Sequence, residues 1–200
     1  MKIIYKYDTN EVKILIIKMG KQEVLIIGEI FHATKQLEEM KERYEFKIFD
    51  STREDFIIKA TEKYENVVAI LLANGAEKLI GKFNTEMLDA LSPAINSILV
   101  IGDASAIVDV SSATDNGVFV ADTTSNLKLN DEEIEMSILD NLEFVLITGV
   151  PKGPVNKLDE VEEKSAKKAI AYITSAAEKA ADSGGELLEG IDVSDIKISL

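Results

Sequence analysis

Residues 23–122 alternate short apolar runs with segments of helical periodicity, and this alternation restricts the fold more than any other feature. The apolar runs predict five buried strands, at EVLIIG (23–28), EFKIFD (45–50), VVAILLA (67–73), SILVIG (97–102) and VFVAD (118–122). The intervening segments predict helices over 32–44, from 51 to about 64, over 83–93 and over 111–117. Such alternation favours a parallel sheet joined by right-handed crossovers. The sequence therefore predicts a three-layer α/β fold with helices on both faces of the sheet.

Capping residues support several of these boundaries. Ser51-Thr-Arg-Glu54 has the pattern of a capping box, and Gly117 is expected to end the helix that begins near 111. Asn130 and Glu133 are expected to cap a further long helix, which the sequence GVPKGP (149–154) interrupts. The apolar face of that helix is predicted to comprise Ile134, Ile138, Leu142 and Val145.

Additional elements are predicted at both ends of a single domain, 1–200. Residues 1–22 predict a strand hairpin, with strands at 2–8 and 11–19 around Asp8, Thr9 and Asn10. The core is expected over 23–156, and residues 157–200 add an alanine-rich helix (159–182) and a final strand (191–200). The added helix is expected to pack within the chain, and the alternative is that it pairs with a partner helix.

Composition excludes several classes of partner. With a net charge of −14, the chain lacks the basic footprint that nucleic acids and anionic membranes require. It contains no cysteine, so disulfides and thiolate metal sites are excluded. No run approaches about 18 apolar residues, and the N-terminus lacks an apolar signal region. A cytoplasmic protein without a membrane span is the expectation.

The carboxyl ends of the strands are the expected ligand edge, because open α/β sheets bind ligands there. The candidate residues at this edge are Asn74, Gly75, Gly102, Asp103, Asp109 and Asp122. Acidic side chains in such positions can hold Mg²⁺, but loop aspartates more often cap helices and turns. Ser111 and Ser112 have no histidine base nearby in the sequence, and no nucleotide-hydrolase phosphate loop occurs.

Several stretches resemble the substrate domain of fungal-type D-2-hydroxyacid dehydrogenases, of the glyoxylate and hydroxypyruvate reductase group. The first block of resemblance includes GEIFHATKQLEEM, STREDF, VVAILLANG, GKFNTEMLDALSP and ATDNGVFVADTTSN. The second block, EEIEMSILDNLEFVLITGVPKGPVN (132–156), is similar to the C-terminal helix and closing loop of that family. Together the blocks cover about residues 23–156. The resemblance implies a flavodoxin-like sheet.

The resemblance also implies a Rossmann domain inserted between the two blocks, and here Asp122 to Asn130 bridges that gap directly. No G-x-G-x-x-G turn occurs, so no NAD(P) site is recognisable. The family takes its substrate-clamping arginine and its acid–base histidine from the inserted domain. Arg43, Arg53 and His32 lie in blocks that match other parts of the family. His32 is expected to cap or pack rather than to catalyse.

The family's substrate loop, which reads like G-A-G-Y-D-x-I-D, corresponds to Gly102–Asp109. Gly102 and Asp109 match, whereas Ala104, Ser105 and Ala106 replace the second glycine, the tyrosine and the first aspartate. Asp103 adds a negative charge where the family's anionic substrate would lie. These departures predict that the loop retains a structural role without a catalytic one.

The expected function is a non-catalytic binding or structural module, as either a natural pseudoenzyme or a designed scaffold. Two alternatives remain. One is an NAD(P)-dependent oxidoreductase component that acts on 2-hydroxy or 2-oxo acids with a cofactor domain supplied in trans. The other is a Mg²⁺ or small-ligand site at the strand edge. A monomer without a bound cofactor is expected, because the resemblance places the family's dimer contacts largely on the absent domain.

Overall fold

A five-stranded parallel sheet forms the centre of the computed structural model, which describes all residues except 1, 9–10, 18–20, 65, 125–127 and 168–200. The strands are β3 (Glu23–Ile27), β4 (Glu45–Phe49), β5 (Val67–Leu72), β6 (Ser97–Val100) and β7 (Phe119–Asp122). Their order is β4-β3-β5-β6-β7, and every neighbouring pair is parallel. The chain reverses its direction of winding between β3 and β5, so the switch point of the sheet lies between these two strands. All five predicted strands and the α/β class are confirmed.

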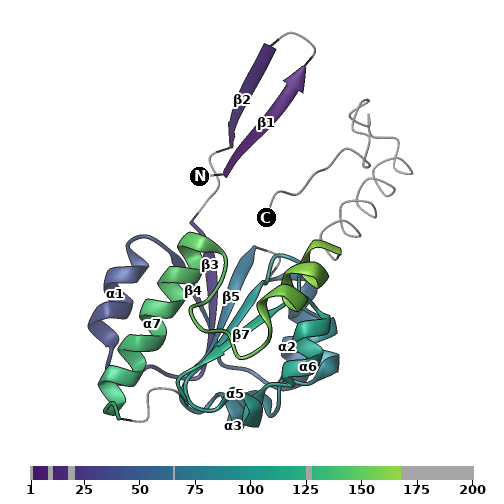
Figure 1. Cartoon of the computed structure of the whole chain (residues 1–200). Coiled ribbons are helices and arrows are strands. Elements are labelled where there is room, and N and C mark those ends of the chain that lie inside the picture. Colours follow the sequence, from purple (N-terminus) through teal and green to yellow (C-terminus); the bar gives the residue numbers. More distant parts are fainter. Residues whose placement is uncertain (1, 9–10, 18–20, 65, 125–127, 168–200) are drawn as a thin grey trace.

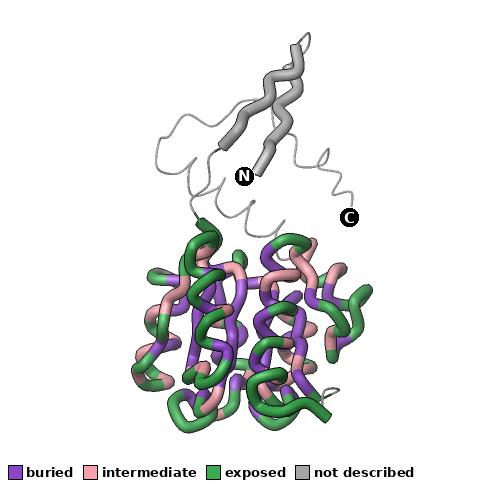
Figure 2. Tube along the Cα trace, turned by 90° about the vertical axis from the view of Figure 1, so that its left-hand side faces the viewer, coloured by how far each residue is buried: buried purple, intermediate pink, exposed green. Residues whose placement is uncertain are grey.

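Helices cover both faces of this sheet, as predicted. The named helices are α1 (Thr34–Lys41), α2 (Arg53–Glu62), α3 (Ala76–Ile80), α4 (Thr85–Asp89), α5 (Ala104–Ile107), α6 (Val110–Asp115) and α7 (Asp131–Thr148). Figure 1 shows α1 and α7 on one side of the sheet, with α2 and α6 on the other. The buried residues concentrate along the strands and on the inner sides of the helices (Figure 2).

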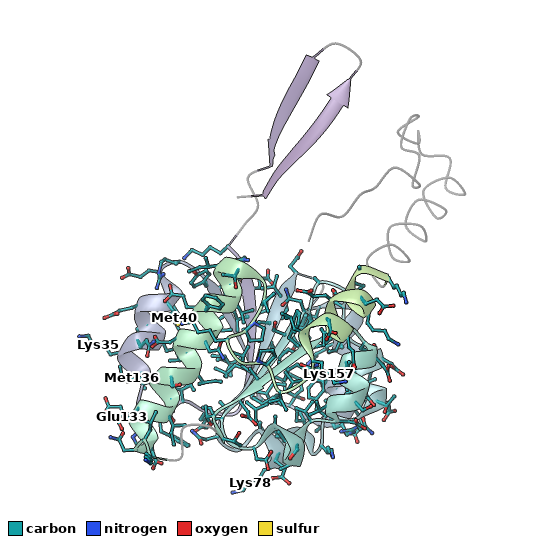
Figure 3. The ribbon with its side chains drawn as sticks, viewed as in Figure 1. Lys35, Met40, Lys78, Glu133, Met136 and Lys157 are labelled. Atoms are coloured by element: carbon teal, nitrogen blue, oxygen red, sulfur yellow. The ribbon has the colours of Figure 1, made fainter. Side chains whose placement is uncertain are left out.

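Alternation along the strands divides the core into two clusters. On β3, Leu25 and Ile27 pack toward the α2 side, whereas Val24 and Ile26 pack toward α1 and α7. The cluster beneath α1 and α7 includes Met40, which Figure 3 labels, and Leu142. Period-two alternation with apolar residues on both faces is what a doubly covered sheet requires.

Several predicted boundaries need correction. The helices α3 and α5 were not predicted, because five and four residues are too few to display a helical period. The helix predicted over 83–93 is confined to α4, and Phe83 instead forms an isolated parallel bridge with Val108. The cap of α2 is Thr52 rather than Ser51, since the Thr52 side chain accepts from the N–H of Asp55. In contrast, Asn130 and Glu133 form the capping box predicted for α7.

The N-terminal strands form their own two-stranded sheet. β1 (Lys2–Asp8) and β2 (Glu11–Ile17) pair antiparallel, which confirms the predicted hairpin. The strand predicted over 191–200 and the helix predicted beyond residue 167 lie outside the described residues.

The edge strand β7 is covered by the segment Val155–Asn156. The N–H of Val155 donates to the carbonyl of Val120 over 2.7 Å, and the Asn156 side chain accepts from the Val120 N–H over 3.0 Å. The same side chain donates to the carbonyl of Val118 over 2.9 Å. Because Asn156 is buried, these bonds satisfy backbone groups that would otherwise face the outer side of β7.

Residues 158–167 are helical, and this helix packs against the turn between α6 and β7. Gly117 follows α6 with a φ of 66°, and a Cβ built there would lie 2.5 Å from both Cα and N of Ser165. Lys164 also pairs with Asp115 over 3.2 Å. The described part of the predicted 159–182 helix thus packs within the chain.

Replacing Gly117 with Ala is expected to destabilise the fold by more than the cost of its left-handed backbone alone, because the new methyl group meets backbone that cannot rotate away. Gly149→Ala is the matched control, since its φ of 85° is also positive but no atom lies within 4 Å of the added Cβ. Urea unfolding should give a loss of about 1 kcal/mol for the control. Gly117→Ala should lose about 2 kcal/mol more. Equal losses would show that residues 158–167 do not press on this turn.

Candidate functional site

A cavity of about 420 Å³ opens at the carboxyl ends of the strands, where the sequence predicts a ligand edge. Asn74, Gly102 and Asp103 line it, so three of the six candidate residues are brought together. Phe31, Ile101 and Ile134 supply apolar surface, and Glu135 and Asp131 come from the start of α7. The cavity therefore combines loops after β3, β5 and β6 with the helix that follows β7.

The most connected group at this edge is the carboxylate of Glu135, which is only 1% exposed. Its Oε1 accepts from the N–H of Phe31 over 3.0 Å and from Nδ2 of Asn74 over 2.8 Å. Its Oε2 accepts from the N–H of His32 over 2.6 Å and of Ala33 over 2.9 Å. Successive backbone donors before a helix form an anion-binding concavity, and in this chain an internal carboxylate fills it.

Asn74 links this carboxylate to the switch point. Its backbone forms an antiparallel bridge with Glu29, and its Nδ2 also donates to the Glu29 carbonyl over 3.2 Å. Gly28 permits the approach, because a Cβ there would lie 2.5 Å from the carbonyl oxygen of Asn74. The predicted turn at Asn74-Gly75 is therefore also a crosslink between the loops after β3 and β5. Gly75 itself precedes α3 and lines a neighbouring hollow with Lys78 and Leu79.

Hydrogen bonding decides the ionisation of Glu135. Burial raises the pKa of this carboxyl group, but the backbone donors of Ala33, Phe31 and His32 outweigh burial, and the pKa lies below its usual value. The group is therefore charged near neutral pH. The negative charge also lies at the N-terminus of α1, where the helix dipole favours an anion.

The three candidate aspartates act as caps. Asp103 Oδ1 accepts from both the N–H and the Oγ of Ser105, and Asp109 accepts from the N–H of Ser112. Asp122 Oδ2 accepts from the N–H of Ala104, and its Oδ1 accepts from Thr124. Hydrogen bonds from Ser105 lower the pKa of Asp103. Asp109 lies apart from the cavity lining, and Asp122 lines a separate hollow beneath α7.

These side chains do not assemble a metal centre. Within the described part of the chain, no three His, Asp or Glu residues are grouped in a way that could hold a metal ion.

The same part of the chain has no helix long and apolar enough to cross a membrane.

The residues that were weighed for catalysis, Arg43, Arg53 and His32, make contacts that stabilise the fold. Arg53 donates to the carbonyls of Ile80 over 3.0 Å and Lys82 over 2.7 Å, so it fixes the link between α3 and α4. Arg43 pairs with Glu143 and joins the end of α1 to α7. The His32 side chain is exposed, and its ring stacks edge-on against Phe31. The contribution of His32 to this site is its backbone N–H, which donates to Glu135. The sequence predicted a capping or packing role for this residue.

Glu135 itself was not singled out from the sequence, although a signal was present. It lies three residues before Ile138 and seven before Leu142, so it shares their helical face. A carboxylate on the buried face of a helix needs a hydrogen-bonded partner. The partner could not be identified from the sequence, because it is a set of backbone donors about one hundred residues earlier in the chain.

Replacing Glu135 with Gln is expected to destabilise the fold by about 3 kcal/mol, because the amide loses the charge and turns two of its own donors toward backbone donors. Glu132→Gln is the matched control, since Glu132 is an exposed carboxylate in the first turn of the same helix, α7. The control should stay within about 0.5 kcal/mol of the parent in urea unfolding. A Glu135 variant as stable as this control would contradict the structural role of the carboxylate.

The lowered pKa of Glu135 predicts a pH dependence of stability. A carboxyl group with a depressed folded-state pKa contributes its full stability above its unfolded value of about 4.3, and loses it as the pH falls through the folded value. As the pH is lowered from 7 to 3, the urea concentration at the unfolding midpoint should therefore fall more steeply for the parent chain than for Glu135→Gln. Parallel curves would show that this carboxylate does not carry the acid sensitivity.

Comparison with known proteins gives the relatives of this chain. No protein-family model matches it. Over 103 residues it is 34% identical to a Schizosaccharomyces pombe protein whose name gives it as a 2-hydroxyacid dehydrogenase, and the match covers 51% of this chain and 31% of that protein. Over 101 residues it is 38% identical to 4-methyl-2-oxopentanoate reductase A of Aspergillus oryzae, covering 50% of this chain and 31% of the reductase. The chain thus matches about a third of the length of these relatives.

Among solved structures, the holo form of Rhodotorula graminis D-mandelate dehydrogenase has a TM-score of 0.50 at 16% identity, covering 84% of this chain and 42% of that chain. At this identity the likeness shows the α/β fold alone. The homologues and structural neighbours of this chain are thus D-2-hydroxyacid dehydrogenases, and the sequence relationship extends over about half of its residues.

Proposed function

We propose that this chain is a non-catalytic binding module built on the substrate-domain fold of a D-2-hydroxyacid dehydrogenase. One observation carries the proposal: the Glu135 carboxylate occupies the anion-binding position before α1. A module of this kind keeps the sheet and its ligand edge, but the backbone donors that could bind an anionic ligand there bind the chain's own Glu135 carboxylate.

The dinucleotide that such dehydrogenases use does not fit the described residues. A pyrophosphate needs unengaged backbone N–H groups at a helix N-terminus. At the described ligand edge, the N–H groups of Phe31, His32 and Ala33 donate to Glu135, and the N–H of Ala104 donates to Asp122. The N–H of Gly102 donates to Oγ1 of Thr123 over 2.8 Å. A phosphate would have to displace a carboxylate or a hydroxyl at each of these positions.

A 2-oxo acid meets the same obstacle. Its carboxylate would enter a cavity lined by Asp103, Asp131 and Glu135, and among the described residues no lysine or arginine lines that cavity. Both arginines of the chain are engaged elsewhere, by backbone carbonyls and by Glu143. Like charges at close range disfavour such a substrate.

Titration with NADH and NADPH, followed by nucleotide fluorescence, is expected to give no saturable binding, with or without glyoxylate or hydroxypyruvate. Absorbance at the nicotinamide band should show no oxidation of either nucleotide. The Aspergillus reductase, assayed with 4-methyl-2-oxopentanoate, serves as the positive control.

Saturable nucleotide binding, or turnover of glyoxylate, would overturn the proposal. Turnover that appears only when a separate dinucleotide-binding protein is added would overturn it in favour of an oxidoreductase component acting in trans.

A further inference from the structure

The cavity at the carboxyl edge has the size of a small-ligand site, and its volume of about 420 Å³ lies within the usual range for such sites. Phe31, Ile101 and Ile134 form apolar parts of its wall. Phe31 is 58% exposed, although it is an aromatic residue beside a well-packed core. This surface suits the apolar body of a ligand.

The polar part of the lining is rich in carboxylate acceptors, and the side chains of His32 and Thr123 also lie on it. The backbone N–H groups of Phe31 and His32 donate to Glu135, and that of Gly102 donates to Thr123. The amide of Asn74 donates to Glu135 and to the Glu29 carbonyl. A ligand that needs donors from the protein therefore finds these groups already used.

Two carboxylates remain for a ligand that supplies its own donors. Ser105 engages Oδ1 of Asp103, the backbone N–H of Ala106 also interacts with this carboxylate, and the residue is exposed. Asp131 is exposed at the first position of α7, on the cavity wall. Glu135 adds a third negative charge at the cavity wall, and each of its oxygens already accepts two hydrogen bonds from backbone or amide donors.

We propose that this cavity binds a small organic cation, namely a primary ammonium group that carries an apolar body. The ammonium donates to Asp103 and Asp131, and the body packs against Phe31, Ile101 and Ile134. The exposed ring of Phe31 adds the attraction of an aromatic face for a cation. This inference rests on the proposed function and names its ligand class, which has the opposite charge to a 2-oxo acid.

Benzylammonium tests the proposal, with benzyl alcohol and benzoate as probes of nearly the same shape but neutral and negative charge. The full chain is titrated with each probe at low salt, and binding is followed by amide chemical shifts and by thermal shift. Benzylammonium is expected to bind saturably. Benzyl alcohol should bind at least fivefold more weakly, benzoate should give no saturable shift, and added salt should weaken benzylammonium binding.

Asp103→Asn and Asp131→Asn are each expected to weaken benzylammonium binding two- to fivefold, and the double variant about tenfold. Asn retains the ability to cap α5, and a melting curve of each variant checks that the fold is kept. Asp159→Asn is the matched control, because Asp159 is an exposed carboxylate in the first turn of the helix at 158–167 and lies outside the cavity lining. This control should bind like the parent.

Equal binding of benzylammonium and benzyl alcohol would overturn the proposal, as would variants at Asp103 and Asp131 that bind like the Asp159 control. Saturable benzoate binding would overturn it in favour of an anionic ligand. None of these outcomes depends on nicotinamide nucleotides. Failure of the ammonium site is therefore distinguishable from failure of the non-catalytic assignment, which only nucleotide binding or turnover would reveal.

Discussion

The carboxyl edge of the sheet depends on one buried charge. Glu135 connects the start of α1, the loop after β5 and the long helix α7 through four hydrogen bonds to a single carboxylate. Removing the side chain would leave one buried and three partly buried donors without this partner, and an unsatisfied buried donor is more costly than the loss of the bond itself. The same charge gives the edge its electrostatic character, because it neutralises the positive end of α1 from within the protein.

The fold was largely predictable from the sequence, and the reasons are local. Strands such as VVAILLA are short apolar runs, and the capping box at Asn130 and Glu133 involves residues three apart. The elements that were missed, α3 and α5, are too short to show a period. The cap of α2 differed by one residue because both Ser51 and Thr52 have hydroxyl side chains that can accept from a helix N-terminus, and helix ends are commonly misplaced by a residue or two.

The candidate site was predictable in place but not in content. Parallel strands bring their carboxyl ends to one edge, so Asn74, Gly102 and Asp103 were expected there and do line one cavity. Glu135 could not be paired with its donors, since the contact joins Phe31, His32 and Ala33 to a residue more than one hundred positions later. The relatives show which enzymes the sequence resembles over about half of its length, whereas the proposed ligand preference of this edge rests on its engaged donors and its acidic lining.

The segment Val155–Asn156 has a consequence for self-association. By covering the outer backbone groups of β7, it closes one side of the described sheet, whereas β4 hydrogen-bonds only to β3 within that sheet. Within the described five-stranded sheet, strand addition then has one edge available, at β4, where Ile48 is 58% exposed. Two copies could join through their β4 strands and leave no further open strand. Assembly through the edges of the five-stranded sheet is therefore limited to pairs, whereas the separate β1–β2 sheet lies outside this restriction.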